Sequence, residues 1–160
     1  MYRDAEIAAM KDVPEFIRKA HEIYGYRHFV NDTAGSLCEL DDPDALRVLA
    51  EHTLILYMEA TEEEGRQLFR RAEEDPKPLY YREAFLDEQF AVYLREKKLR
   101  DVARIDPDDF VLWMFPRLFV SRIPRYEGIA RDFGYAIRSD VLVGVETEEE
   151  FLRRVEKVLE

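Results

Sequence analysis

Residues 28–36 read His28-Phe29-Val30-Asn31-Asp32-Thr33-Ala34-Gly35-Ser36, a short apolar run followed by an acid and a turn of small residues. This order is typical of a buried parallel strand whose C-terminal end lies at a phosphate or metal site of an α/β protein. Asp32 is therefore a candidate catalytic acid, and the amides and hydroxyls of residues 33–36 can face an anion. In the alternative interpretation, Asp32 only begins a turn.

The residues around this stretch predict helices that alternate with strands. Residues 53–58 are continuously apolar, as in a strand that is covered on both faces. Thr61 and Glu64 form a T-x-x-E capping box for the helix that follows. Together with a strand at 27–31, this alternation predicts a parallel sheet with right-handed crossovers. Four helices are expected in this half of the chain. The first covers about 5–10, and the second restarts at Asp12-Val13-Pro14 and is ended by Gly25. The third begins at Asp42-Pro43-Asp44, and the fourth covers 62–74.

The second half of the chain predicts more helix than strand. Asp75-Pro76-Lys77-Pro78 breaks the pattern, and a helical hairpin with arms at about 83–97 and 107–132 follows. Pro116 kinks or restarts the second arm. Residues 135–138 form a short candidate strand, and a second T-x-x-E box at Thr147 opens the last helix.

Composition limits the classes of function. The 160 residues carry a net charge of −11, a sign that phosphate backbones repel, so no nucleic-acid partner is expected. The single cysteine, Cys38, fits a reducing cytoplasm and is expected to be a small buried hydrophobe. The charged N-terminus is unlike a signal peptide, and no apolar run is long enough for a membrane span. The three histidines are too scattered for a metal motif, so no metal ligands are predicted.

One segment departs from the acidic average. Five arginines and two acids lie between Arg117 and Arg138. Such a segment can hold an anionic ligand by bidentate contacts, or it can be a solvated helix face with local ion pairs. Both interpretations remain open on the sequence.

Within that segment, residues 122–130 read Arg122-Ile123-Pro124-Arg125-Tyr126-Glu127-Gly128-Ile129-Ala130. The pattern R-x-P-x-Y-E-x-I-A resembles the helix after the lid in shikimate kinases and related P-loop small-molecule kinases. The order of other segments is similar. Residues 32–36 stand where that family has its strand-end glycine turn, and 56–61 resemble its next strand and cap. Lys77-Pro78-Leu79 resembles the R-P-L of the family's lid. Near the start of the chain, Tyr2-Arg3 with Glu6 is similar to the family's F-R-x-x-E.

The resemblance implies an α/β fold: an incomplete three-layer, P-loop kinase-like parallel sheet in one domain, 1–160, with a helical lid-like insertion at 76–118. It implies that Thr33, Gly35, Ser36 and Arg122 bind a small anionic substrate, with Arg122 on its carboxylate. It also implies that Arg70, Arg71 and Lys77 bind ATP, which comes with Mg²⁺ in this family. A homo-oligomer is a further expectation.

The sequence also departs from the family. The turn has one glycine, Lys77 replaces the lid arginine, and no G-x-x-x-x-G-K-S/T loop is present, since none of the six glycines precedes a lysine. By the resemblance, the P-loop and first strand would lie upstream of Met1. Two functions are therefore expected: ATP-dependent phosphotransfer or hydrolysis in the complete protein, or an inactive interaction or regulatory module with a kinase-like fold. An unrelated metal or thiol enzyme is disfavoured.

Overall fold

The computed structural model describes residues 2–33, 36–77 and 79–160, and in this part the chain is mostly helical. Its one sheet there has two strands, β1 (Ile55–Glu59) and β2 (Gly134–Arg138), which run parallel with Ile55 opposite Gly134. The predicted three-layer, P-loop kinase-like sheet is therefore wrong. The predicted strands at 53–58 and 135–138 exist, but the strand predicted at 27–31 does not join them.

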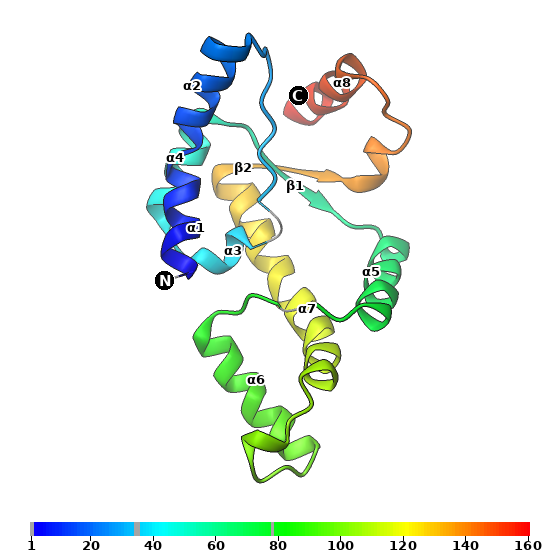
Figure 1. Cartoon of the computed structure of the whole chain (residues 1–160). Helices are drawn as coiled ribbons and strands as arrows, with labels where there is room; N and C mark the ends of the chain where they lie inside the picture. The colour runs from blue at the N-terminus through cyan, green and yellow to red at the C-terminus, as the bar shows by residue number, and fades with distance from the viewer. Residues whose placement is uncertain (1, 34–35, 78) are drawn as a thin grey trace.

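The segment predicted as the first strand is an extended coil. It leaves the end of α2 (Val13–Tyr24), runs along the N-terminal helices and reaches α3 (Leu37–Leu40) (Figure 1). Residues 27–30 are all exposed, whereas a strand of a three-layer sheet is buried on both faces. The apolar run predicts a core strand, but in the folded chain it lies outside the core.

Four helices form the N-terminal body: α1 (Tyr2–Lys11), α2, α3 and α4 (Pro43–His52). Their core centres on Val13, Leu37, Leu40 and Leu49. The predicted cap at Asp42 is confirmed, since its carboxylate accepts from the Ala45 amide at 2.7 Å. The predicted cap at Asp12 is wrong, because Asp12 itself has helical backbone angles and its side chain makes no capping bond.

The sheet is covered less than the sequence predicts. None of the β1 residues is fully buried, and Met58 is exposed. The prediction that this strand is covered on both faces is therefore wrong. α5 (Glu62–Glu74) follows β1 and begins at Thr61, where the predicted capping box with Glu64 is confirmed. Gly25 ends α2 with a positive φ of 68°, also as predicted.

The predicted hairpin is confirmed as α6 (Glu83–Glu96) and the first half of α7 (Pro107–Phe133), joined through the 3-10 turn η1 (Val102–Arg104). An aromatic cluster packs between the two arms of the hairpin. The Tyr93 ring lies edge-on to Phe110, with 5.0 Å between ring centroids, and edge-on to Trp113, with 5.2 Å. Tyr93 also donates to Asp109 at 2.6 Å. α7 continues through Pro116 without a restart.

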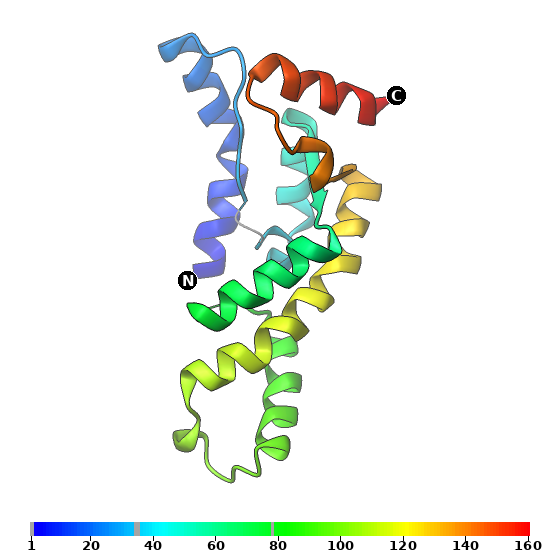
Figure 2. The same cartoon turned by 90° about the vertical axis from the view of Figure 1, so that its right-hand side faces the viewer.

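α7 is the central element of the molecule. Its first half extends away with α6, and its second half lies against both strands and against α3 and α4 (Figures 1 and 2). This one helix therefore links the hairpin to the N-terminal body. The assignment of 76–118 as a lid stays a prediction.

After β2, the 3-10 turn η2 (Ser139–Leu142) leads to α8 (Glu148–Leu159). Thr147 accepts from the Glu150 amide at 3.2 Å, but the Glu150 carboxylate accepts from the Glu146 amide, so the second predicted capping box is only half formed. His28 Nδ1 lies 2.6 Å from a Glu148 carboxylate oxygen and links the extended coil to α8. Among the residues that the structure describes, no helix has the length and apolar character to cross a membrane.

Candidate functional site

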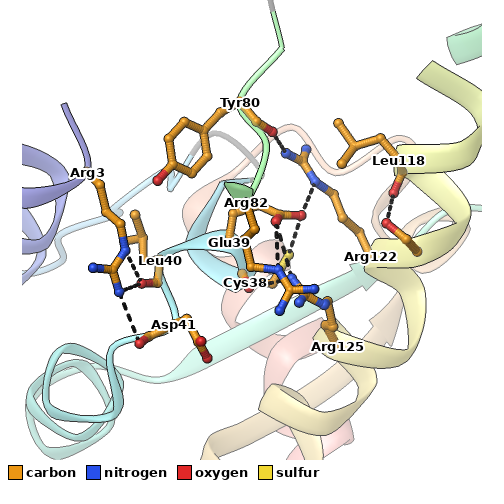
Figure 3. Close-up of polar contacts among 11 residues, drawn as sticks. Arg3, Cys38, Glu39, Leu40, Asp41, Tyr80, Arg82, Leu118, Arg122 and Arg125 are labelled. Carbon is orange, nitrogen blue, oxygen red and sulfur yellow. Dashed lines mark hydrogen bonds and ion pairs between the residues drawn. The ribbon is translucent and has the colours of Figure 1, made fainter. Parts of the chain in front are cut away.

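The most unusual side chain in the described part is Glu39 in α3, a charged residue that is only 2% exposed. Its carboxylate lies among three guanidinium groups (Figure 3). Arg122 Nε is 3.0 Å from Oε1, Arg125 Nη1 is 3.2 Å from Oε2, and Arg82 Nε is 3.4 Å from Oε2. We call these four residues the Glu39 cluster.

The position of Glu39 is set by the short helix that carries it. All four residues of α3 are buried, and Asp41 ends the helix with a left-handed φ of 50°. Arg3 of α1 caps this end, because its guanidinium donates to the Leu40 carbonyl at 2.8 Å and to the Asp41 carbonyl at 3.2 Å. The carboxylate is therefore fixed from the N-terminal body.

The three arginines come from two other elements. Arg122 and Arg125 are three residues apart and so share one face of α7. Arg122 Nη2 also donates to the Tyr80 carbonyl at 2.8 Å, and Arg125 Nη1 donates to the Cys38 carbonyl at 3.1 Å. Arg82 is the N-cap residue of α6. The Glu39 cluster thus joins the body, the central helix and the base of the hairpin.

The electrostatics of the cluster follow from its burial. A buried carboxylate without partners is costly, so the guanidinium groups stabilise Glu39 in its place. Burial also raises the pKa of Tyr81 to about 12, although the Arg122 charge acts in the opposite direction. Burial raises the pKa of Tyr126 and of the Cys38 thiol as well. Cys38 therefore stays protonated at neutral pH, which fits a buried structural residue and not a nucleophile.

The arginines of the basic segment 117–138 fall into two groups, and a role in holding an anionic ligand stays a prediction. Arg122 and Arg125 point inward to Glu39, which is an anion of the chain itself. The other three arginines bind neighbours in sequence: Arg117 stacks on the Trp113 ring at 3.6 Å, Arg131 pairs with Asp132 at 2.8 Å, and Arg138 donates to Asp140 at 3.1 Å.

Of the residues predicted on the substrate side, Arg122 lies in α7, whereas Asp32, Thr33 and Ser36 lie between α2 and α3. Asp32 is exposed there and is not at the end of a strand. The Ser36 hydroxyl donates to the Thr33 carbonyl at 3.3 Å, so this turn satisfies its own polar groups in part. Gly35 lies outside the described residues. The ligand roles of Asp32, Thr33, Gly35 and Ser36 stay predictions.

The predicted ATP-side residues lie at the end of α5 and just after it. Arg70 pairs with Glu63 at 3.2 Å, and Lys77, 74% exposed, pairs with Asp75 at 3.0 Å. Arg71 is exposed on the same helix. In residues 2–33, 36–77 and 79–160, no recorded polar contact joins any of these three to Arg122. Their roles stay predictions, and Pro78 of the lid motif lies outside the described residues.

The sequence predicts no functional role for two residues of the Glu39 cluster, Glu39 and Arg82. Glu39 stands in the apolar run Leu37-Cys38-Glu39-Leu40, and an acid between buried positions is the signal that could have shown it. The sequence around Arg82 carries no comparable signal. Arg82 stands between a proline-rich break and a helix, and its side chain does not cap the start of that helix.

The chemistry open to the cluster is binding. Guanidinium groups stay protonated and present donors only, so they hold oxyanions but do not exchange protons at ordinary pH. In the part of the chain that the structure describes, no group of three or more His, Cys, Asp or Glu residues is placed to hold a metal ion. Comparison with family models, with curated proteins and with solved structures finds no significant match to this chain.

Proposed function

We propose that this protein is a non-catalytic interaction module that pairs with a second copy of itself through residues 28–32. The observation that carries the proposal is the state of the backbone there. The segment that contains residues 28–31 is extended (Figure 1). None of the amide or carbonyl groups of these four residues has a recorded hydrogen bond within the described residues. A row of free donors and acceptors on an extended segment is a template for another strand.

The side chains of this region support the same proposal. Five large apolar residues within 23–30 are exposed, with Val30 at 82%: Ile23, Tyr24, Tyr26, Phe29 and Val30. The Tyr24 and Tyr26 rings stack on each other at 5.5 Å and not on a core. Clusters of exposed apolar side chains on a protein surface commonly mark interaction sites.

A second copy is the occupant that fits the segment. Antiparallel pairing about a two-fold axis at Val30 places His28 opposite Asp32, Phe29 opposite Asn31 and Val30 opposite Val30. This match sets two β-branched side chains against each other at the axis. The net charge of −11 per chain opposes association over longer distances, so salt at physiological strength, which screens beyond about 8 Å, favours the pair.

We expect sedimentation velocity at a low and a high protein concentration to show a monomer and a dimer, respectively. Val30→Asp places two like charges at the two-fold axis and is expected to give a monomer at both concentrations. Val143→Asp is the matched control, because Val143 is similarly exposed, at 71%, but lies after η2. A wild-type chain that stays monomeric at both concentrations, or a Val30→Asp variant that dimerises like Val143→Asp, contradicts the proposal.

ATP-dependent phosphotransfer or hydrolysis remains a prediction for the complete protein, as does a cytoplasmic location. For this chain alone we expect no ATP hydrolysis above the blank in the presence of Mg²⁺, because phosphoryl transfer depends on positioning and the sequence lacks a phosphate-binding loop. A phosphate-release assay measures this. Turnover that survives repurification and is lost in Asp32→Ala, but not in the exposed control Asp44→Ala, would show the prediction to be wrong.

A further inference from the structure

The charges of the Glu39 cluster do not balance. Three guanidinium groups surround one carboxylate, so the cluster carries two more positive than negative charges. The side chains of Arg122 and Arg125 are only 20% and 22% exposed, and that of Arg82 is 36% exposed. Half-buried charges of one sign are costly unless an opposite charge lies nearby. This surplus stands out in a chain whose net charge is −11.

The three arginines use their donors to different extents. Arg122 is occupied by Glu39 and by the Tyr80 carbonyl, and Arg125 by Glu39 and the Cys38 carbonyl. Arg82 Nε lies 3.4 Å from Glu39 Oε2 but is buried without a hydrogen-bond partner in the described part. No hydrogen bond is recorded there for its two terminal nitrogens either. Arg125 donates through Nη1 alone, whereas no hydrogen bond is recorded in the described part for any nitrogen of Arg82, which leaves its whole guanidinium group for a ligand.

Two groups next to Arg82 in the chain also lack a recorded partner within the described residues. The hydroxyl of Tyr81, the residue before Arg82, is buried without a hydrogen-bond partner among the described residues. α6 begins at Arg82 without a side-chain cap on its first amides. The positive end of the α6 dipole, at Arg82, favours an anion on this side of the cluster, although the exposed Glu83 already lies in the first turn.

We infer that Arg82 is the primary contact of an oxyanion-binding site at the base of the hairpin, with the surplus charge of the cluster behind it. The ligand is a carboxylate or a phosphate group, because a planar guanidinium fork matches two oxygens of either one. Glu39 already occupies Arg122, so the bound group contacts the outer face of the cluster and leaves the Glu39 bonds in place. The inference does not depend on pairing through residues 28–32.

The site is tested by titration with sodium phosphate and, in a separate arm, with sodium acetate, while sodium chloride keeps the ionic strength constant. Arginine side-chain 1H–15N resonances are followed by NMR. We expect a saturable shift of the Arg82 Nε–Hε signal with at least one of the two anions, and the tighter arm identifies the class of ligand. Arg82→Ala is expected to weaken binding of that anion, as read from the shifts of the backbone amides of α6, by about 10- to 100-fold.

Two variants make the result specific. Arg82→Lys keeps the charge but removes the fork, so we expect binding between that of wild type and Arg82→Ala. Arg47→Ala is the control, since Arg47 is exposed and pairs with Asp44 at 2.7 Å, and its titration should match wild type. Equal affinities in wild type, Arg82→Ala and Arg47→Ala, or the absence of a saturable shift with both anions, would overturn the inference. Because each variant's fold is checked by its backbone spectrum, a loss of binding through unfolding is recognised directly.

Discussion

Replacing Glu39 by alanine is expected to lower the free energy of unfolding by about 3–5 kcal/mol, the range for removing one partner of a buried ion pair. Glu39 is 2% exposed, and it is the only acid recorded in contact with Arg82, Arg122 and Arg125 in the described part. Without it, three guanidinium groups face one another in a partly desolvated space. Urea unfolding followed by circular dichroism measures the change.

Two comparisons separate charge from packing in this result. Glu88→Ala removes an exposed acid from α6 and is expected to stay within about 0.5 kcal/mol of wild type. The double variant Glu39→Ala/Arg82→Ala removes one of the repelling charges and should recover part of the loss. If Glu39→Ala is as stable as Glu88→Ala, the cluster does not hold the three elements together.

Replacing Gly134 by alanine is expected to cost about 3 kcal/mol, the upper end of the usual range for overpacking. A Cβ atom at this position would lie 2.3 Å from the Ile55 carbonyl oxygen and 2.8 Å from the Ile55 Cβ. The first of these is a backbone atom of the paired strand, so it cannot move aside without breaking the β1–β2 register. Urea unfolding should show the loss, and amide exchange across β1 should become faster.

Gly65→Ala is the matched control for this substitution. Gly65 lies in α5, and a Cβ atom there would meet nothing within 4 Å. Alanine is the better helix former, so this variant is expected to be more stable than wild type by about 0.5–1 kcal/mol. A Gly134→Ala variant that gains stability in the same way would show that the two strands are not paired in this register.

Local signals in the sequence predicted the helices well. The Asp42 cap, the Thr61–Glu64 box and the left-handed Gly25 are all set by neighbours within four residues, and each is present. The hairpin arms were visible for the same reason, because one face of each arm repeats at helical spacing. The predicted cap at Asp12 is wrong because Asp12 itself has helical backbone angles, which Val13 and Pro14 continue.

The sheet and the cluster could not be predicted in this way, because both depend on distant partners. Residues 28–30 have the composition of a core strand, yet no strand in the described part of the chain pairs with them, and all three residues are exposed. Whether an apolar run is buried is decided by the rest of the fold. The sequence predicts that Arg122 binds the carboxylate of a substrate. The anion that Arg122 contacts in the structure is Glu39, 83 residues away along the chain.

The most direct test of the proposed self-pairing is amide hydrogen exchange of residues 28–31 at a low and a high protein concentration. These amides have no recorded hydrogen bond within the described residues of one chain, so pairing with a second copy is what would protect them. We predict fast exchange at low concentration and, at high concentration, slowed exchange of the alternate amides that face the second copy, with no concentration dependence in Val30→Asp. Equally fast exchange at both concentrations would contradict the account.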